Sequence, residues 1–164
     1  MIYSNLGESP PAPDAAPYAE LWHNEIAAND KAYSDQGDTQ YTGGHAPATE
    51  VHFVVRDTQR VAVLSLLDTS TGCTAKTDIA ADNASIKFCP LKIAIYEAGA
   101  VTTAAGRMGC FLELNAPTSG DPSNSVSYAT YDIGARSFKT GVIVNHEPVP
   151  GCSEIISLDK QLVP

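Results

Sequence analysis

The fold is decided by residues Lys87 to Leu114, KFCPLKIAIYEAGAVTTAAGRMGCFLEL. This segment predicts two apolar strands joined by a turn of small residues. Side chains alternate between the two faces of a strand, so residues of one parity share a face. The expected buried face carries Cys89, Leu91, Ile93 and Ile95 in the first strand, and Met108, Cys110, Leu112 and Leu114 in the second. The two strands are expected to form the centre of the fold, with a cysteine of each on the buried face.

Further strand-like segments follow from about Glu50 onward. In EVHFVVRD, residues 50–57, the alternation turns Val51, Phe53 and Val55 to one face and His52 to the other. The more continuous apolar run RVAVLSLLD, residues 60–68, is typical of a strand that is buried on both faces. Three later segments have strand character: SVSYATYDI (125–133), KTGVIVNHE (139–147) and SEIISLD (153–159).

The sequence therefore predicts a mainly β fold of about seven or eight short strands. We expect two packed antiparallel sheets, arranged as a sandwich or a jelly roll, with an immunoglobulin-like sandwich or a small barrel as alternatives. At 164 residues the chain is long enough to bury a core without a metal or a disulfide. Residues 18–164 are expected to form one domain.

One helix is predicted, over residues 17–29. Pro17 suits the first position of a helix because its missing amide is harmless there. Tyr18, Leu21, Trp22 and Ile26 then lie on one face at helical spacing. We interpret Trp22, the one tryptophan, as a core anchor that covers a sheet, with a ligand-stacking platform as the alternative.

The first seventeen residues are predicted to form an extended arm. Prolines fix backbone angles and remove amide donors, which favours a polyproline-like conformation. Such an arm can dock on another subunit or pack on its own domain, and both interpretations stay open. The prolines are Pro10, Pro11, Pro13 and Pro17.

Charge limits the classes of partner. The net charge is −9, from 19 acidic residues against 10 Lys and Arg, and no run of three basic residues occurs. Nucleic acid and anionic membrane surfaces are therefore not expected as partners. No segment approaches the length of a membrane span, and the first residues lack a signal-peptide pattern. Charged residues make up only 18%, which with the polar uncharged remainder favours a virion-surface or extracellular location.

The four cysteines lack the CxxC spacing of structural zinc and redox motifs. Four cysteines permit three full pairings. We favour Cys73 with Cys89 and Cys110 with Cys152, because Cys73 lies on a loop that can fold back on its neighbouring strand. The alternative is four reduced thiols that pack as small hydrophobic side chains.

Histidines are the other candidate ligands or bases. His45, His52 and His146 could converge on a metal, with His23 as an outlier, but the close His pair of cupin-type centres is missing. Solvated or hydrogen-bonded histidines are the simpler interpretation. A serine nucleophile with His146 as base and Asp132 or Glu147 as acid is formally possible, although no GxSxG motif occurs.

Three further kinds of site were considered: a calcium loop, a glycosylation site and a phosphate-binding loop. The acidic residues Asp30, Asp35 and Asp38 lack the spacing of a calcium loop and predict a solvated loop. Asn83 begins the acceptor tripeptide Asn-Ala-Ser, which matters only in a eukaryotic secretory pathway. No glycine-rich phosphate loop is found, so no cofactor is expected.

Aromatic residues are expected on an outward sheet face, where they can be covered by another subunit, covered by the N-terminal helix, or stacked on sugar rings. We expect a non-enzymatic structural protein that binds protein subunits in a homo-oligomer or a larger shell, such as a capsid decoration protein. A secreted carbohydrate- or ligand-binding sandwich is the second hypothesis, and a histidine-based hydrolase or metal enzyme is the third. The predicted interaction face comprises Tyr96, Phe111, Tyr128 and Tyr131.

Overall fold

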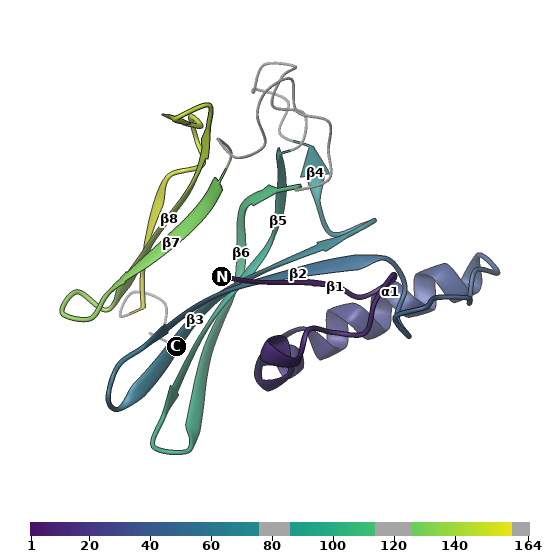
Figure 1. Cartoon of the computed structure of the whole chain (residues 1–164), viewed down its shortest axis with the longest axis horizontal. Helices are drawn as coiled ribbons and strands as arrows, with labels where there is room; N and C mark the ends of the chain where they lie inside the picture. The colour runs from purple at the N-terminus through teal and green to yellow at the C-terminus, as the bar shows by residue number, and fades with distance from the viewer. Residues whose placement is uncertain (76–85, 114–125, 159–164) are drawn as a thin grey trace.

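The computed structural model describes residues 1–75, 86–113 and 126–158 and has a mainly β fold with two antiparallel sheets, as predicted (Figure 1). These ranges contain ten strands rather than seven or eight, because β1, β4 and β9 are short additional pieces. The strands are β1 (Ile2–Asn5), β2 (Ala48–Arg56), β3 (Arg60–Thr69), β4 (Thr74–Ala75), β5 (Ile86–Glu97), β6 (Ala100–Leu112), β7 (Val126–Asp132), β8 (Ser137–Val144), β9 (Glu147–Pro148) and β10 (Glu154–Ser157). The helices are η1, a 3-10 helix (Pro13–Trp22), and α1 (His23–Asp35).

The larger sheet is organised around β5, which lies between β3 and β6. On the far side of β3, β2 is followed by β1 at the edge of the sheet. The short strand β4 pairs with Lys87 and Phe88 of β5, beyond the residues that pair with β3. The predicted central pair of strands is therefore present, with β5 inside the sheet and β6 at its edge.

A β-bulge changes the side-chain pattern of β6. Leu91 of β5 faces Arg107, whereas Ile93 faces Ala104, so Lys92 lies opposite two residues, Ala105 and Gly106. Gly106 has a φ of +87°, a conformation that glycine adopts without steric cost. One extra residue reverses which side chains face the core beyond this point.

The expected buried face of the second strand is wrong for this reason. Met108 is 44% exposed, whereas Phe111 is buried at 2%. Cys110 lies opposite Phe88 in the register and so faces away from Cys89. Leu112 is buried, but in a separate cluster, and Leu114 lies outside the described residues. In the first strand all four predicted residues are buried.

The smaller sheet has the order β10–β8–β7, with β9 paired to β8. The β8–β9 turn is made by Asn145 and His146, both with positive φ, as type I′ turns require. The strands of the smaller sheet lie on one side of the larger sheet, and the helices lie on the other side (Figure 1).

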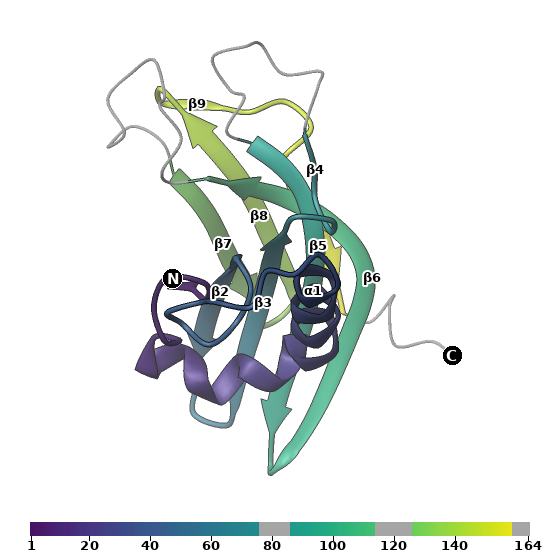
Figure 2. The ribbon, with the colours of Figure 1, turned by 90° about the vertical axis from the view of Figure 1, so that its right-hand side faces the viewer.

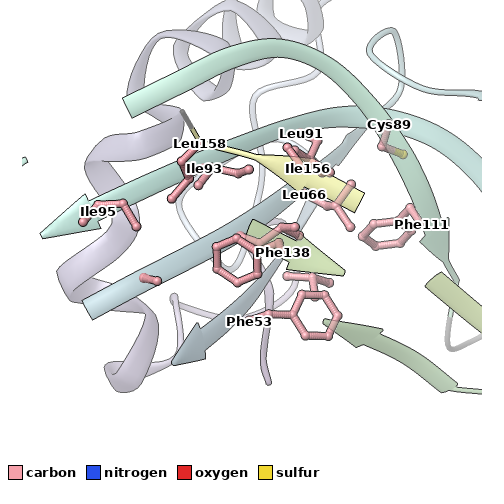
Figure 3. Packing of buried hydrophobic residues seen from close by; sticks show 13 residues of the cluster. Phe53, Leu66, Cys89, Leu91, Ile93, Ile95, Phe111, Phe138, Ile156 and Leu158 are labelled. Carbon is pink, nitrogen blue, oxygen red and sulfur yellow. The ribbon is translucent and has the colours of Figure 1, made fainter. Parts of the chain in front are cut away.

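Side chains from both sheets share one hydrophobic core (Figure 3). Val51 and Phe53 of β2 point into this core, as the alternation predicts, and Phe138 of β8 enters it from the other sheet. Because both faces of β3 are covered, its apolar run Ala62–Leu67 is buried throughout. The core comprises Val51, Phe53, Ala62, Leu64, Leu66, Cys89, Leu91, Ile93, Ile95, Phe111, Phe138, Ile156 and Leu158.

The helical segment covers the opposite face of the larger sheet (Figure 2). Tyr18, Trp22 and Ile26 are buried there, so Trp22 is a core residue that covers a sheet. The α-helix begins at His23 and ends at Asp35, not at 17 and 29 as predicted. Pro13 and Pro17 lie in the tighter helix η1, and regular α-helix starts only after the last proline. No helix in the described part of the chain is long and apolar enough to cross a membrane.

The predicted extended arm is part of the domain. Ile2–Asn5 form β1, and the Tyr3 hydroxyl donates a hydrogen bond to the Leu112 carbonyl at 2.8 Å. Burial, together with the nearby Asp68 carboxylate, raises the pKa of Tyr3 to about 12, so this hydroxyl keeps its proton. Farther along, the Ala12 amide donates to Ser4 Oγ at 3.1 Å. The N-terminal segment is thus attached to its own sheet, which was the alternative to docking on another subunit.

Candidate functional site

The four aromatic residues of the predicted interaction face do not share a surface. Phe111 lies in the core between the sheets. Tyr96 packs against Tyr18 of η1, with ring centroids 5.8 Å apart, so the helical segment covers it. Tyr131 contacts Phe138 at 4.9 Å, and Tyr128 is half-buried on β7. A continuous outward aromatic face is therefore absent from this set.

The exposed backbone edge of β6 is the most prominent candidate interface. The strand has 13 residues, and β5 is its one strand partner within residues 1–75, 86–113 and 126–158. Ala100–Thr103 are exposed, and Val101 is 52% accessible. Residues 98–106 contain no charged side chain. Edge strands are usually protected by charge or proline, and this half of β6 has neither.

The second half of β6 lies near the smaller sheet. Arg107 Nη1 of β6 forms an ion pair with Glu154 Oε1 of β10. Both partners are about one-third exposed, so the ion pair contributes little to stability, but it marks where the two sheets approach each other. Next to this ion pair, Met108 follows Arg107 on β6 and Ile155 follows Glu154 on β10. Both apolar side chains are exposed, Met108 at 44% and Ile155 at 70%. The part of the edge that is both exposed and uncharged is in the first half of the strand, at Ala100–Thr103.

Two disulfides join the pairs that the sequence analysis favoured. Cys73–Cys89 connects the segment before β4 to β5, with the Cα atoms 4.3 Å apart. Cys110–Cys152 connects β6 of the larger sheet to the segment before β10 of the smaller sheet, with the Cα atoms 5.5 Å apart. Paired cysteines are typical of oxidising compartments.

A buried chain of polar side chains lies beneath the helical segment. The Trp22 indole donates to Ser65 Oγ at 2.6 Å, and Ser65 Oγ lies 2.9 Å from His52 Nδ1. Because the indole occupies the oxygen as an acceptor, the Ser65 hydroxyl can donate its proton to His52 Nδ1. His52 Nε2 then faces Glu50 Oε2 at 3.4 Å. All four side chains are almost fully buried.

This chain contains a serine, a histidine and a carboxylate, but it is not a nucleophilic site. Ser65 is completely buried beneath Trp22, so no substrate carbonyl can reach its hydroxyl. The histidine also presents Nδ1 to the serine and Nε2 to the carboxylate, the reverse of a hydrolase triad. The arrangement positions Trp22 and Glu50 and fixes the helical segment on the sheet.

Ser65→Ala is expected to lower the free energy of unfolding by about 2 kcal/mol, because it leaves Trp22 Nε1 and His52 Nδ1 buried without their partner. Chemical denaturation followed by circular dichroism measures the change. Ser70→Ala, at an exposed position, is the matched control and should change stability by less than about 0.5 kcal/mol. Equal values for the two variants would contradict the hydrogen-bonded chain.

A small pocket of about 150 Å³ opens beside this chain, between the helical segment and β2. Its walls include Leu6, Ile26 and Ala27, and Glu50 also lines it. Nothing in the sequence placed these residues together, because they come from three separate segments: the residue after β1, the helix α1 and the strand β2.

A hollow of about 390 Å³ lies beside the first disulfide, and its lining includes Asp68, Cys73, Lys87 and Glu113. Lys87 Nζ contacts Asp68 at 2.9 Å and Glu113 at 3.4 Å. Burial alone would lower the pKa of Lys87, but the two carboxylates outweigh it and raise the pKa. The single ammonium is shared by both carboxylates, so each of these three groups has an ionic partner while one negative charge remains in excess.

The three histidines considered as possible metal ligands do not converge. His45 Nδ1 pairs with Asp30 Oδ2 at 2.8 Å, His52 lies in the buried chain, and His146 is in the β8–β9 turn. His23 is exposed at the start of α1. Among the described residues, one cluster has metal-ligand spacing, Asp68 with Cys73 and Cys89, and both of its sulfurs are in a disulfide.

The remaining sequence candidates also have separate roles. Asp30 accepts a hydrogen bond from the Ala46 amide at 2.7 Å, while Asp35 pairs with Lys31. These aspartates and the exposed Asp38 therefore do not gather around one point. Asp132 lies opposite Ser137 at the start of β8, whereas His146 lies in the turn after the end of that strand, so the length of β8 separates these two members of the suggested serine-hydrolase trio. Asn83 lies outside the described residues.

Comparison with protein-family models, with curated proteins and with solved structures found no match to this chain.

Proposed function

We propose that the protein is a non-enzymatic structural module that binds protein subunits through the open half of the β6 edge, with a second copy of the chain as its partner. The exposed, uncharged Ala100–Thr103 segment is the observation that carries this proposal. Two such edges related by a twofold axis can pair antiparallel, because a twofold interface places the same surface of each subunit together.

The backbone supplies the attraction in this arrangement. Unpaired amide and carbonyl groups of one edge hydrogen-bond to the other copy, while β-branched Val101 and Thr103 pack against their counterparts across the junction. The two sheets, proposed here to act as layers of a sandwich around their common core, give the edge a rigid support. Assembly into a larger shell, such as a virus capsid, would use the same edge as a point of attachment.

Charge sets the conditions for this association. Each copy has a net charge of −9, so copies repel one another as a whole. Residues 98–106 add no charge to the contact itself. Salt screens the overall repulsion, so self-association is expected to strengthen as ionic strength rises.

Thr103→Lys is expected to weaken dimerisation at least about tenfold, because it places two like charges at the junction. Sedimentation equilibrium over a range of protein concentrations measures the dissociation constant. Thr58→Lys is the matched control, since Thr58 is exposed in the β2–β3 turn and the change in net charge is identical. It should leave the dissociation constant unchanged.

The proposal fails if the protein remains monomeric at high concentration and high salt. It also fails if both lysine variants associate as tightly as the parent chain. A stable monomer would favour the second hypothesis, a secreted ligand-binding domain, for which the two disulfides are equally suitable.

A further inference from the structure

The pocket beside β2 has a buried, incompletely bonded carboxylate. Glu50 is 1% exposed and lines the pocket. Its Oε2 faces His52 Nε2 at 3.4 Å, whereas its Oε1 has no hydrogen-bond partner in the part of the chain that the structure describes. A buried acceptor without a donor is unfavourable, so this atom is suited to accept a hydrogen bond from a ligand.

The other charged groups of the pocket favour a cation. Glu20 is exposed at its rim, and Asp30 lies on its wall. Asp30 is already bonded to His45 and to the Ala46 amide, so it adds a negative field rather than a free acceptor. Neither Lys nor Arg occurs among the lining residues, which do include the imidazoles of His23 and His45. The three carboxylates give the pocket a negative field that favours a positively charged ligand.

The shape of the pocket favours an organic cation over a metal ion. Direct chelation of a metal ion requires several ligand atoms close together. Among the described residues, neither Glu50 nor Asp30 belongs to a group of three ligand atoms that lie within 4.8 Å of one another. The walls formed by Leu6, Ile26 and Ala27 are apolar. A volume of about 150 Å³ is comparable to that of a cavity that admits benzene, and a four-carbon chain has a similar size.

We propose that this pocket binds a primary alkylammonium group, with the ammonium donating to Glu50 Oε1 and the alkyl chain lying against Ile26 and Ala27. A free small amine and the side chain of a lysine both present this chemistry. The site is separate from the β6 edge, so its occupation does not depend on self-association.

Trp22 provides a readout near the pocket. It is the one tryptophan of the protein, and its indole bonds to Ser65, which bonds to His52. His52 Nε2 lies 3.4 Å from Glu50 Oε2 without a hydrogen bond to it. Titration of the full-length protein with n-butylammonium is expected to give saturable binding by calorimetry and a parallel change in Trp22 emission. Neither n-butanol nor butyrate should bind comparably, because neither brings the positive charge.

Ala27→Leu tests the pocket without changing any charge. Ala27 is exposed and lines the pocket, so the larger side chain should fill the space and weaken n-butylammonium binding at least about tenfold. Ala28→Leu is the matched control, because Ala28 is exposed on α1 but does not line the pocket. Glu50→Gln should weaken binding to a similar degree while it preserves the shape of the side chain. If this buried substitution prevents folding, the Ala27 and Ala28 pair still decides the question.

A blocked lysine, acetylated at its α-amino group and amidated at its carboxyl group, distinguishes the two sources of the ammonium. Binding as tight as that of n-butylammonium would identify a lysine side chain as an acceptable ligand, and binding of the free amine alone would restrict the site to small amines. The proposal is overturned if n-butylammonium does not saturate the protein, if n-butanol binds equally well, or if Ala27→Leu leaves binding unchanged.

Discussion

Replacing Cys110 and Cys152 together by Ala is expected to lower the free energy of unfolding by about 4 kcal/mol, because the unfolded chain gains the freedom of a long loop. The two cysteines are 42 residues apart. Their disulfide also joins β6 of the larger sheet to the segment before β10 of the smaller one. Its loss should therefore weaken the attachment between the sheets as well as enlarge the unfolded ensemble. Chemical denaturation under non-reducing conditions measures the difference.

The Cys73 and Cys89 double replacement is the internal comparison. This disulfide closes a separation of 16 residues and lies within the larger sheet. The same loop-entropy relation gives a loss of about 3 kcal/mol, smaller than that for the longer loop. A mass measurement with and without reductant establishes that both bonds are present in the parent protein. If the 42-residue pair costs less than the 16-residue pair, loop entropy does not control the stability of this fold.

Local alternation predicted much of the larger sheet correctly. Val51 and Phe53 are buried on one face of β2 and His52 is turned to the other, because a strand without a bulge keeps its period of two. The continuous apolar character of β3 likewise reflects real burial on both faces, with the smaller sheet on one side and the helical segment on the other. These features depend on residues within a few positions of one another, so the sequence alone is sufficient.

Features that depend on pairing were not predictable in this way. The bulge opposite Lys92 reverses the pattern of β6, and its sequence signal is one glycine, Gly106, among several small residues. The helix start was misplaced because Pro17 was assigned to the first turn of an α-helix, whereas it lies inside a 3-10 helix. The N-terminal prolines did not prevent Ile2–Asn5 from completing the sheet.

The buried polar chain had a partial signal in the sequence. Glu50 and His52 share the parity opposite to Val51 and Phe53, and Ser65 interrupts an otherwise apolar strand. Polar residues at such positions indicate a face that is covered and internally hydrogen-bonded. Their partner Trp22 lies 43 residues before Ser65, so only the tertiary structure reveals that the chain ends on Trp22 and that Glu50 lines a pocket.

Phe111→Ala is expected to lower the free energy of unfolding by about 3–5 kcal/mol, because it removes a large side chain from the core between the sheets. Phe111 is 2% exposed, and its ring lies 6.3 Å from that of Tyr3 in an edge-to-face arrangement. Tyr3 belongs to β1, so the cavity would also loosen the N-terminal strand against the rest of the domain. Thermal and chemical unfolding of the purified variant measure the loss.

Val101→Ala is the matched control, because it truncates an apolar side chain on the same strand before the bulge. Val101 is 52% exposed, so its loss should cost less than about 1 kcal/mol in the free energy of unfolding. If β6 had no bulge, Phe111 would face outward and its truncation would cost as little as that of Val101. A small effect of Phe111→Ala would therefore refute the register at Ala105 and Gly106, and with it the assignment of the exposed half of the strand on which the proposed interface depends.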